Sequence, residues 1–271
     1  MLQKRRALDD RTFRAFYSLK AKPRKFTQII KMAKLEKIEG DKLLKEHAKK
    51  RMSFLLNSLY PEMSAERKKE IINKFTERTG LLNLFHYILT GGGKAVYLLN
   101  FDEVKISKKY LNNQVELTNT LDHEAIHFLN DKLKHSFPEK IEEFIADGVS
   151  SSIAPDKVAH QEIERIKDFP HSDISFPLKN KQLGKTLSSV ENLKGMWATS
   201  NTALMRSFPR SSIVLSMSTL LNKTSGLKVR NQFLRDTMEG KNPIFSFNRL
   251  MKGKDIQAII EGKTVKIKKV S

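Results

Sequence analysis

Residues 119–134 read NTLDHEAIHFLNDKLK, and the rest of the fold has to be built around this stretch. Its apolar residues recur at helical spacing and form one broad arc of a helical wheel. Asn119 suits the N-cap position, because Asp122 stands three positions later, where its carboxylate can reach back to the free amides. The sequence therefore predicts a helix from Asn119 to about Lys134.

The centre of this helix carries His123-Glu124-Ala125-Ile126-His127. Two histidines four positions apart project about 40° from each other around a helix, so both rings can reach one ion. Glu124 would point toward a water molecule at that ion. The chain contains no cysteine, which excludes thiolate metal sites, thiol nucleophiles and iron–sulfur clusters. Any metal must sit on histidines and carboxylates, and Zn2+ is the ion we expect.

A catalytic zinc site needs a third protein ligand and an open position for water. The nearby candidates are His135, Glu142, Glu143, Asp131 and Asp147. Glu143 is the strongest, because it lies on a second predicted helix, which starts at the capping sequence Ser136-Phe-Pro-Glu and ends near residues 150–152. That helix can turn back antiparallel and present a carboxylate to the ion. Asp147 lies one turn later, where it can accept a ring N–H from a ligating histidine, whereas we expect Glu142 on the surface.

The pattern His-Glu-x-x-His followed by Glu143-Phe-Ile-Ala-Asp147 resembles the glutamate-type zincins, or gluzincins, a group of zinc peptidases that includes thermolysin. The resemblance covers about residues 95–152. It implies that His123, His127 and Glu143 are metal ligands and that Glu124 is the general base. It also implies that Asp147 supports a ligating histidine. The metzincin pattern fits less well, because Asn130 and Leu133 stand where that family has a glycine and a third histidine.

The resemblance further implies an antiparallel strand upstream of the metal helix, on which the backbone of a substrate pairs. Residues 95–101 or 104–107 can supply it, since both stretches have the composition of strands. A donor that stabilises the transition state, usually a histidine or a tyrosine, is also expected. The candidates are His171, Tyr110, His135 and Tyr97.

The remaining sequence predicts an α+β protein that is mainly helical, with a zincin-like core and a small antiparallel sheet. We divide the chain into a basic helical N-terminal region (1–80), a zincin-like catalytic core (81–155) and a helical C-terminal subdomain (156–271). The flanking regions can pack on the core as one body. Helices are predicted around residues 43–59, 65–77, 81–89, 156–167, 187–206, 212–221, 227–238 and 256–261. Residues 264–269 alternate like an edge strand or form a basic tail.

Charge and targeting signals limit the possible partners. The chain has 50 Lys and Arg against 30 Asp and Glu, a net charge of +20. Residues 1–51 hold 17 basic and 6 acidic residues, hence +11 of that total, so this segment can contact nucleic acid or remain a solvated helical face. The N-terminal residues show no uninterrupted apolar segment and no small-residue cleavage site, so we expect no secretory signal; an Arg-rich organellar presequence is the alternative. No apolar run reaches the roughly 20 residues that a membrane span needs, so we expect a soluble, cytoplasmic protein.

These observations favour an intracellular zinc metallopeptidase that acts on a protein or peptide substrate. Two other functions remain open at this point. One is a regulatory protein that associates with nucleic acid and carries a zincin module. The other is a non-catalytic interaction protein that a metal stabilises.

Overall fold

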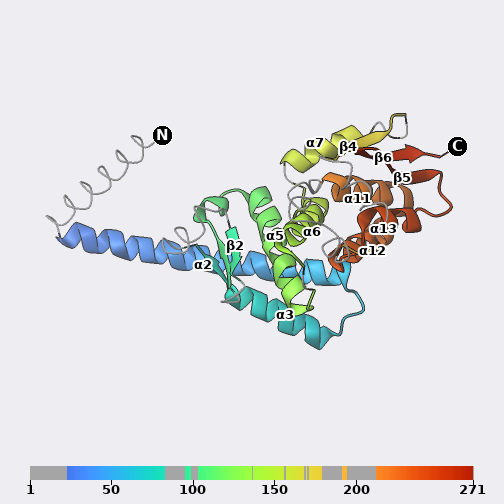
Figure 1. The fold of residues 1–271 in the computed structure, drawn as a ribbon. Helices are drawn as coiled ribbons and strands as arrows, with labels where there is room; N and C mark the ends of the chain where they lie inside the picture. The colour runs from blue at the N-terminus through green and yellow to red at the C-terminus, as the bar shows by residue number, and fades with distance from the viewer. Residues whose placement is uncertain are drawn as a thin grey trace.

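The computed structural model describes residues 23–82, 95–98, 103–135, 137–155, 157–167, 169, 171–178, 191–193 and 212–270. This part of the chain is mainly helical and contains two small sheets (Figure 1). The mainly helical α+β class that the sequence predicts is confirmed. No helix in these ranges is both long enough and apolar enough to cross a membrane.

Two helices form the N-terminal part of the described chain. Helix α2 (Pro23–Leu59) is long, and its first half extends beyond the body of the molecule (Figure 1). Its second half is amphipathic and buries Leu44, Met52 and Leu56 in the core. Helix α3 (Ala65–Arg78) packs against it and is capped by Ser64, whose side chain accepts a hydrogen bond from the backbone N–H of Arg67.

The first sheet lies beside these helices in the order β1-β3-β2. Strand β1 (Thr79–Leu81) runs parallel to β3 (Glu103–Ile106), and β2 (Ala95–Leu98) runs antiparallel to β3. Both predicted strands are thus confirmed, and residues 99–101 of the first one lie outside the described ranges. The helix predicted over residues 81–89 begins with a strand residue, Leu81, and residues 83–89 lie outside the described ranges.

The helix with the two histidines, α5 (Gln114–Lys132), follows the short 3-10 helix η2 (Lys108–Tyr110). The predicted start at Asn119 is wrong. The N-cap is Asn113, whose side chain accepts a hydrogen bond from the backbone N–H of Glu116. Asn119 instead donates its amide to the carbonyl oxygen of Ala154 at 2.9 Å, so it ties this helix to the end of the next one.

Helix α6 (Glu139–Ile153) follows and ends close to the predicted position. The predicted capping box is not its start, because Pro138 occupies the N-cap and carries no side-chain cap; Ser136 lies outside the described residues. Helix α6 packs along α5, and residues further along α5 meet residues earlier on α6. The two helices are therefore antiparallel, as the sequence predicts.

The described C-terminal residues form four helices and the second sheet. The helices are α7 (Lys157–Ile166), α11 (Ser212–Ser225), α12 (Leu227–Met238) and α13 (Pro243–Leu250). The sheet has the order β4-β6-β5, with all neighbours antiparallel, and its strands are β4 (Ile174–Pro177), β5 (Ile256–Glu261) and β6 (Thr264–Lys269). Most of the helix predicted over residues 187–206 lies outside the described chain.

Two predictions in this part are wrong. Residues 256–261 form strand β5 and not a helix, because their β-branched isoleucines pair with β6 across a short hairpin. The sequence predicts that residues 264–269 form either an edge strand or a basic tail. They form strand β6, which is the central strand of the second sheet and not an edge. Its second neighbour is β4, a strand that no sequence signal indicated.

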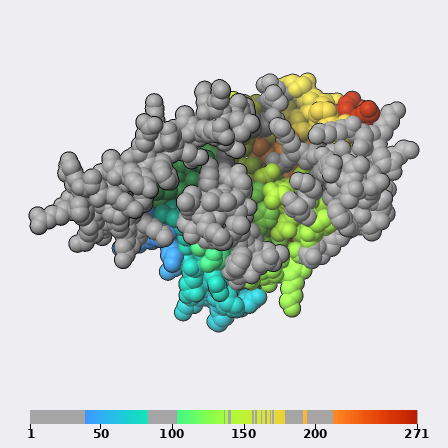
Figure 2. All heavy atoms as spheres, turned by 60° about the vertical axis from the view of Figure 1, so that its left-hand side comes forward, coloured from blue at the N-terminus to red at the C-terminus, as the bar shows by residue number. Residues whose placement is uncertain are grey.

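A single cluster of buried apolar side chains joins the described parts of the N-terminal, middle and C-terminal regions. Helix α6 is held between α5 and α11. The approach of α6 to α11 depends on Gly148, since a Cβ atom there would lie 2.8 Å from the Cβ of Val214. On the face shown in Figure 2, α3 and the α5–α6 segment lie side by side at the lower edge.

Candidate metal centre

Helix α5 brings its two histidine rings together on one face. The Nε2 atom of His127 lies 3.1 Å from the Nε2 atom of His123. The ring centroids are 4.8 Å apart and the ring planes are inclined by 68°. The i,i+4 spacing alone accounts for this approach, as the sequence predicts.

Helix α6 adds the third side chain. Oε2 of Glu143 lies 3.6 Å from Nε2 of His123, and its Oε1 lies 3.4 Å from Nε2 of His127. One ligand atom from each of the three residues falls within 4.8 Å of the other two, so the group could hold a metal ion. In the described chain this group does not include His135 or Asp131.

The other nitrogen of each ring faces a further carboxylate on α6. Nδ1 of His123 lies 3.0 Å from Oδ1 of Asp147. Nδ1 of His127 lies 3.2 Å from Oε1 of Glu142. In its neutral form, a ring that donates its Nδ1–H to a carboxylate has its lone pair on Nε2, and in both rings Nε2 faces Glu143.

The position of Asp147 is the predicted one, whereas the expectation that Glu142 lies on the surface is wrong. Its side chain is partly buried and faces His127. The two histidines are four residues apart on α5, and their partners are five residues apart on the antiparallel α6. Matching these intervals is the signal that could have identified Glu142.

The carboxylates dominate the electrostatics of the rings. Burial lowers the pKa of His123, but hydrogen bonds to Asp147 and Glu143 outweigh it and raise that pKa to about 10. Burial also opposes protonation of His127, while Glu142 and Glu143 raise its pKa to about 9. Hydrogen bonds from His123 and His127 hold the pKa of Glu143 far below its usual range. Surrounded by acidic groups, the cluster favours a cation, either protons or a metal ion.

Glu124 lies beside these rings. Only 6% of its surface is exposed, and its charge contributes to the raised pKa of both His123 and His127. Its carboxylate is therefore within electrostatic reach of both rings.

A buried ion pair anchors α5 next to the histidines. Arg51 of α2 donates to both carboxylate oxygens of Asp122, from Nε at 2.8 Å and from Nη2 at 2.6 Å. The side chain of Asp122 is fully buried, so the helix-capping role predicted for it is wrong. Burial raises the pKa of Asp122 to about 6, against the lowering effect of the guanidinium. An aspartate that interrupts the apolar arc of the helix was the signal of a buried partner.

The structure describes the side chains of three of the four candidate transition-state donors. Tyr110 is buried in η2, with the ammonium of Lys109 over its ring. His135 packs edge-on against the ring of Phe137, and His171 is exposed. The side chain of Tyr97 lies outside the described part of the structure.

No family model, no curated protein and no solved structure matches this chain. The residues of α5 and α6 are therefore the basis for assigning a function.

Proposed function

We propose that this protein is a zinc-dependent metallopeptidase whose metal ligands are His123, His127 and Glu143. One observation carries the proposal. The Nε2 atoms of both histidines face the carboxylate of Glu143, while each Nδ1 atom has its own carboxylate partner. Ring orientation by a carboxylate behind the histidine is the usual arrangement at zinc sites.

The donor set and its spacing fit zinc. Two imidazoles and one carboxylate are ligands that zinc accepts, and the chain has no cysteine to offer. Donors bound tetrahedrally at about 2.0–2.1 Å lie roughly 3.3–3.4 Å from one another. The two Nε2 atoms are 3.1 Å apart, and they lie 3.6 and 3.4 Å from different oxygens of Glu143. One ligand atom from each residue falls within 4.8 Å of the others, so side-chain rotation would bring the three donors to the zinc spacing.

Three protein ligands favour a catalytic site over a structural one. Structural zinc sites usually have four protein ligands, whereas catalytic sites have three and leave one position for water or substrate. A zinc ion held here would supply Lewis acidity, which lowers the pKa of water and polarises a carbonyl group.

Glu124 is the residue we assign to proton transfer. As general base it takes a proton from the attacking water, and as general acid it then returns that proton to the amine of the leaving peptide. Asp147 and Glu142 hold the proton at Nδ1 of each histidine throughout. The assignment of peptide bonds as the substrate is supported by the resemblance of the His-Glu-x-x-His and Glu-x-x-x-Asp pattern to gluzincins.

The test compares the wild-type protein with Glu124→Gln and His127→Ala after zinc reconstitution. Zinc content is measured by atomic emission, and hydrolysis is measured with fluorescent casein and a mixed peptide library. We expect one zinc per chain in the wild type and in Glu124→Gln, hydrolysis reduced at least about 100-fold in Glu124→Gln, and no zinc in His127→Ala. A wild-type protein that binds no zinc refutes the proposal. Bound zinc without hydrolysis would favour a metal-stabilised interaction protein.

A second candidate function is association with nucleic acid. The observation that favours it is the first half of α2, which extends beyond the body of the molecule (Figure 1) and belongs to the basic segment 1–51. Because Leu44 and Ala48 of α2 are in the core, a deletion that tests this role must stop before them. Binding of duplex DNA that weakens with salt and is lost on deleting residues 1–38 would support it.

A further inference from the structure

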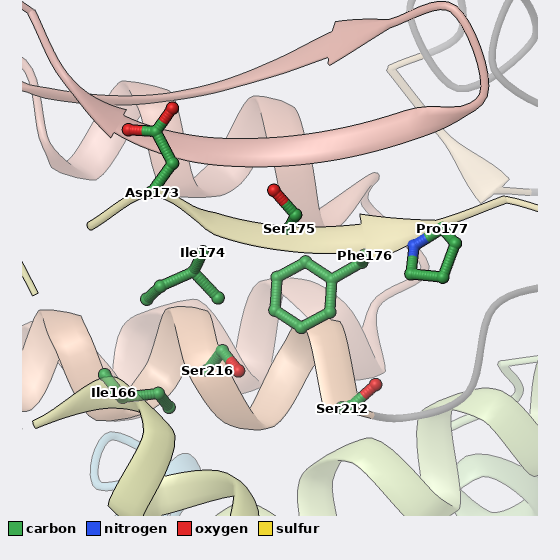
Figure 3. A pocket seen from close by; sticks show the side chains of 8 residues that line it. All are labelled: Ile166, Asp173, Ile174, Ser175, Phe176, Pro177, Ser212 and Ser216. Atoms are coloured by element: carbon green, nitrogen blue, oxygen red, sulfur yellow. The ribbon is translucent and has the colours of Figure 1, made fainter. Parts of the chain in front are cut away.

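A pocket that does not involve the histidine cluster lies between the second sheet and two helices (Figure 3). Its volume is about 310 Å³, at the lower end of the range for ligand pockets. Strand β4 crosses it, α11 forms one wall and the end of α7 contributes to the floor. The lining residues are Ile166, Asp173, Ile174, Ser175, Phe176, Pro177, Ser212 and Ser216.

The lining includes residues from both faces of β4. Figure 3 shows Ile174 and Phe176 turned toward α11, and Asp173 and Ser175 turned away from that helix. Because successive side chains of a strand point to opposite faces, a pocket that touches both sets must run along the edge of the strand.

The edge of β4 that faces away from β6 offers backbone groups. Among the described residues, β4 pairs only with β6. The N–H of Leu178 donates to the carbonyl of Lys263, which continues this register. Since the hydrogen-bonding direction alternates along an antiparallel strand, the backbone N–H and carbonyl groups of residues 174 and 176 also point toward β6. Ser175, between them, therefore points its N–H and its carbonyl outward.

The pocket lining also includes a buried hydroxyl group that has no hydrogen-bond partner among the described residues. Ser216 of α11 is 1% exposed, and its Oγ atom has no hydrogen-bond partner among the described residues. Its neighbour Ser218, equally buried, donates to the carbonyl of Leu215 at 2.9 Å. Buried hydroxyl groups normally have a hydrogen-bond partner, so the Ser216 hydroxyl indicates a partner that the described part of the chain does not supply.

We propose that this pocket and the edge of β4 bind an extended segment of another polypeptide, which adds to the sheet as a strand. In the incoming strand, the residue opposite Ser175 exchanges backbone hydrogen bonds with it. The residues before and after that position in the incoming strand turn their side chains toward α11. There the walls are apolar, formed by Ile166 and Phe176, and the polar group is the Ser216 hydroxyl. The side chain that fits combines an apolar body with a hydroxyl, which means threonine or tyrosine.

Pro177 limits where the incoming strand can pair. It lies at the end of β4 and has no N–H, so an added strand receives a hydrogen bond from Ser175 but none from Pro177. Prolines at such positions limit uncontrolled pairing of sheet edges. The contact is therefore short, and its strength depends on the side chain that enters the pocket. This inference does not rest on the proposed metal centre.

The probes are fluorescein-labelled, capped seven-residue peptides in which valine alternates with threonine, tyrosine or alanine. A fourth peptide repeats the threonine sequence with its alternate backbone amides methylated, so that it cannot pair with a strand. Binding is followed by fluorescence anisotropy with EDTA present, which separates it from any hydrolysis. We expect the threonine or tyrosine peptide to bind at least about tenfold more tightly than the alanine and methylated peptides.

Variants of the full chain assign the contacts. Ser216→Ala should weaken the threonine or tyrosine peptide about fivefold, and the matched control Ser218→Ala should not. Ser175→Pro should abolish peptide binding, while Ser175→Ala retains it; circular dichroism confirms that each variant is folded. No binding of either hydroxyl-bearing peptide at millimolar concentration overturns the proposal, as does equal binding of the methylated peptide. Binding of p-cresol that survives in Ser175→Pro, without peptide binding, would assign the pocket to small molecules instead.

Discussion

The Nδ1 atom of His127 lies 3.2 Å from Oε1 of Glu142, a residue on the neighbouring antiparallel helix. Asp147 occupies the corresponding place behind His123, at 3.0 Å. Each ring of the proposed zinc site is thus oriented by its own carboxylate, and both carboxylates come from α6. The metal centre is a property of the packed helix pair, although its two histidines come from one helix.

Replacing Glu142 by leucine should weaken zinc binding roughly 10- to 100-fold, because the ring of His127 loses the group that fixes its tautomer and orientation. Glu142→Gln should have a smaller effect, since an amide oxygen still accepts the Nδ1–H. Affinity is measured by competition with a chromogenic chelator. Glu70→Gln is the control for lost charge, because Glu70 is exposed and pairs only with Arg67 and Lys74 in the described chain. Equal affinities for Glu142→Leu and this control would contradict the assignment.

Zinc binding should release protons. The pKa values of about 10 for His123 and about 9 for His127 mean that both rings carry an extra proton at pH 7 in the metal-free protein. Ligating histidines must be neutral, so zinc displaces about two protons, and its affinity falls as the pH falls. Calorimetry in buffers of different ionisation enthalpy measures this number. Release of less than one proton at pH 7 would refute the protonation states.

The same pKa values predict how the metal-free fold responds to pH. An unperturbed histidine titrates near about 6.5. Because the folded pKa values of His123 and His127 are raised, the folded state binds more protons than the unfolded state between about 6.5 and about 9–10. Their contribution to the free energy of unfolding is complete below that window and is lost as the pH rises through it. In urea titrations, His123→Ala/His127→Ala should lose this pH dependence.

Arg51→Met should destabilise the protein by about 3–5 kcal/mol at pH 8, because it leaves the buried carboxylate of Asp122 without its counter-charge. Burial already raises the pKa of Asp122 to about 6, and losing Arg51 raises it further. A carboxyl group with a raised pKa becomes less costly as the pH falls through that pKa. The loss of stability should therefore be smaller at pH 5 than at pH 8 in urea unfolding.

The matched control for this change is the double variant Arg51→Met/Asp122→Asn. It removes both charges, so it should recover part of the stability at pH 8 and show no difference between the two pH values. A loss for Arg51→Met that is equal at both pH values would show that packing of the arginine, including its contact with the ring of Phe54, matters more than the charge.

Gly148→Ala should cost about 1–3 kcal/mol of unfolding free energy, because the new methyl group would meet Val214 at 2.8 Å. Adding Val214→Ala should restore part of the loss. Gly80→Ala is the control, since the nearest atoms there are 3.6 Å away at the ends of flexible side chains. An equal response at both glycines in urea unfolding would contradict the close approach of α6 and α11.

How far the site could be predicted depends on the range of the interaction involved. The pairing of His123 with His127 follows from helix geometry alone, so their spacing of four residues was sufficient to predict that the two rings lie together. Glu143 and Asp147 required one further assumption, that the next helix turns back antiparallel, and the structure confirms that arrangement. Predicting the contact of Glu142 with His127 required the register between the two helices, which local sequence patterns do not specify.

The sequence by itself determined the mainly helical class, the histidine-bearing helix and the residues that could hold a metal, because these depend on periodicity and on contacts within a few residues. Only the tertiary structure decided where α5 begins, since Asp122 pairs with Arg51, 71 positions earlier, instead of capping the helix. It also decided that residues 256–261 form a strand, because a short apolar segment becomes a strand only when another strand pairs with it. Around the predicted centre of His123 and His127, long-range packing supplied the rest: the buried anchor from α2 and the second carboxylate from α6.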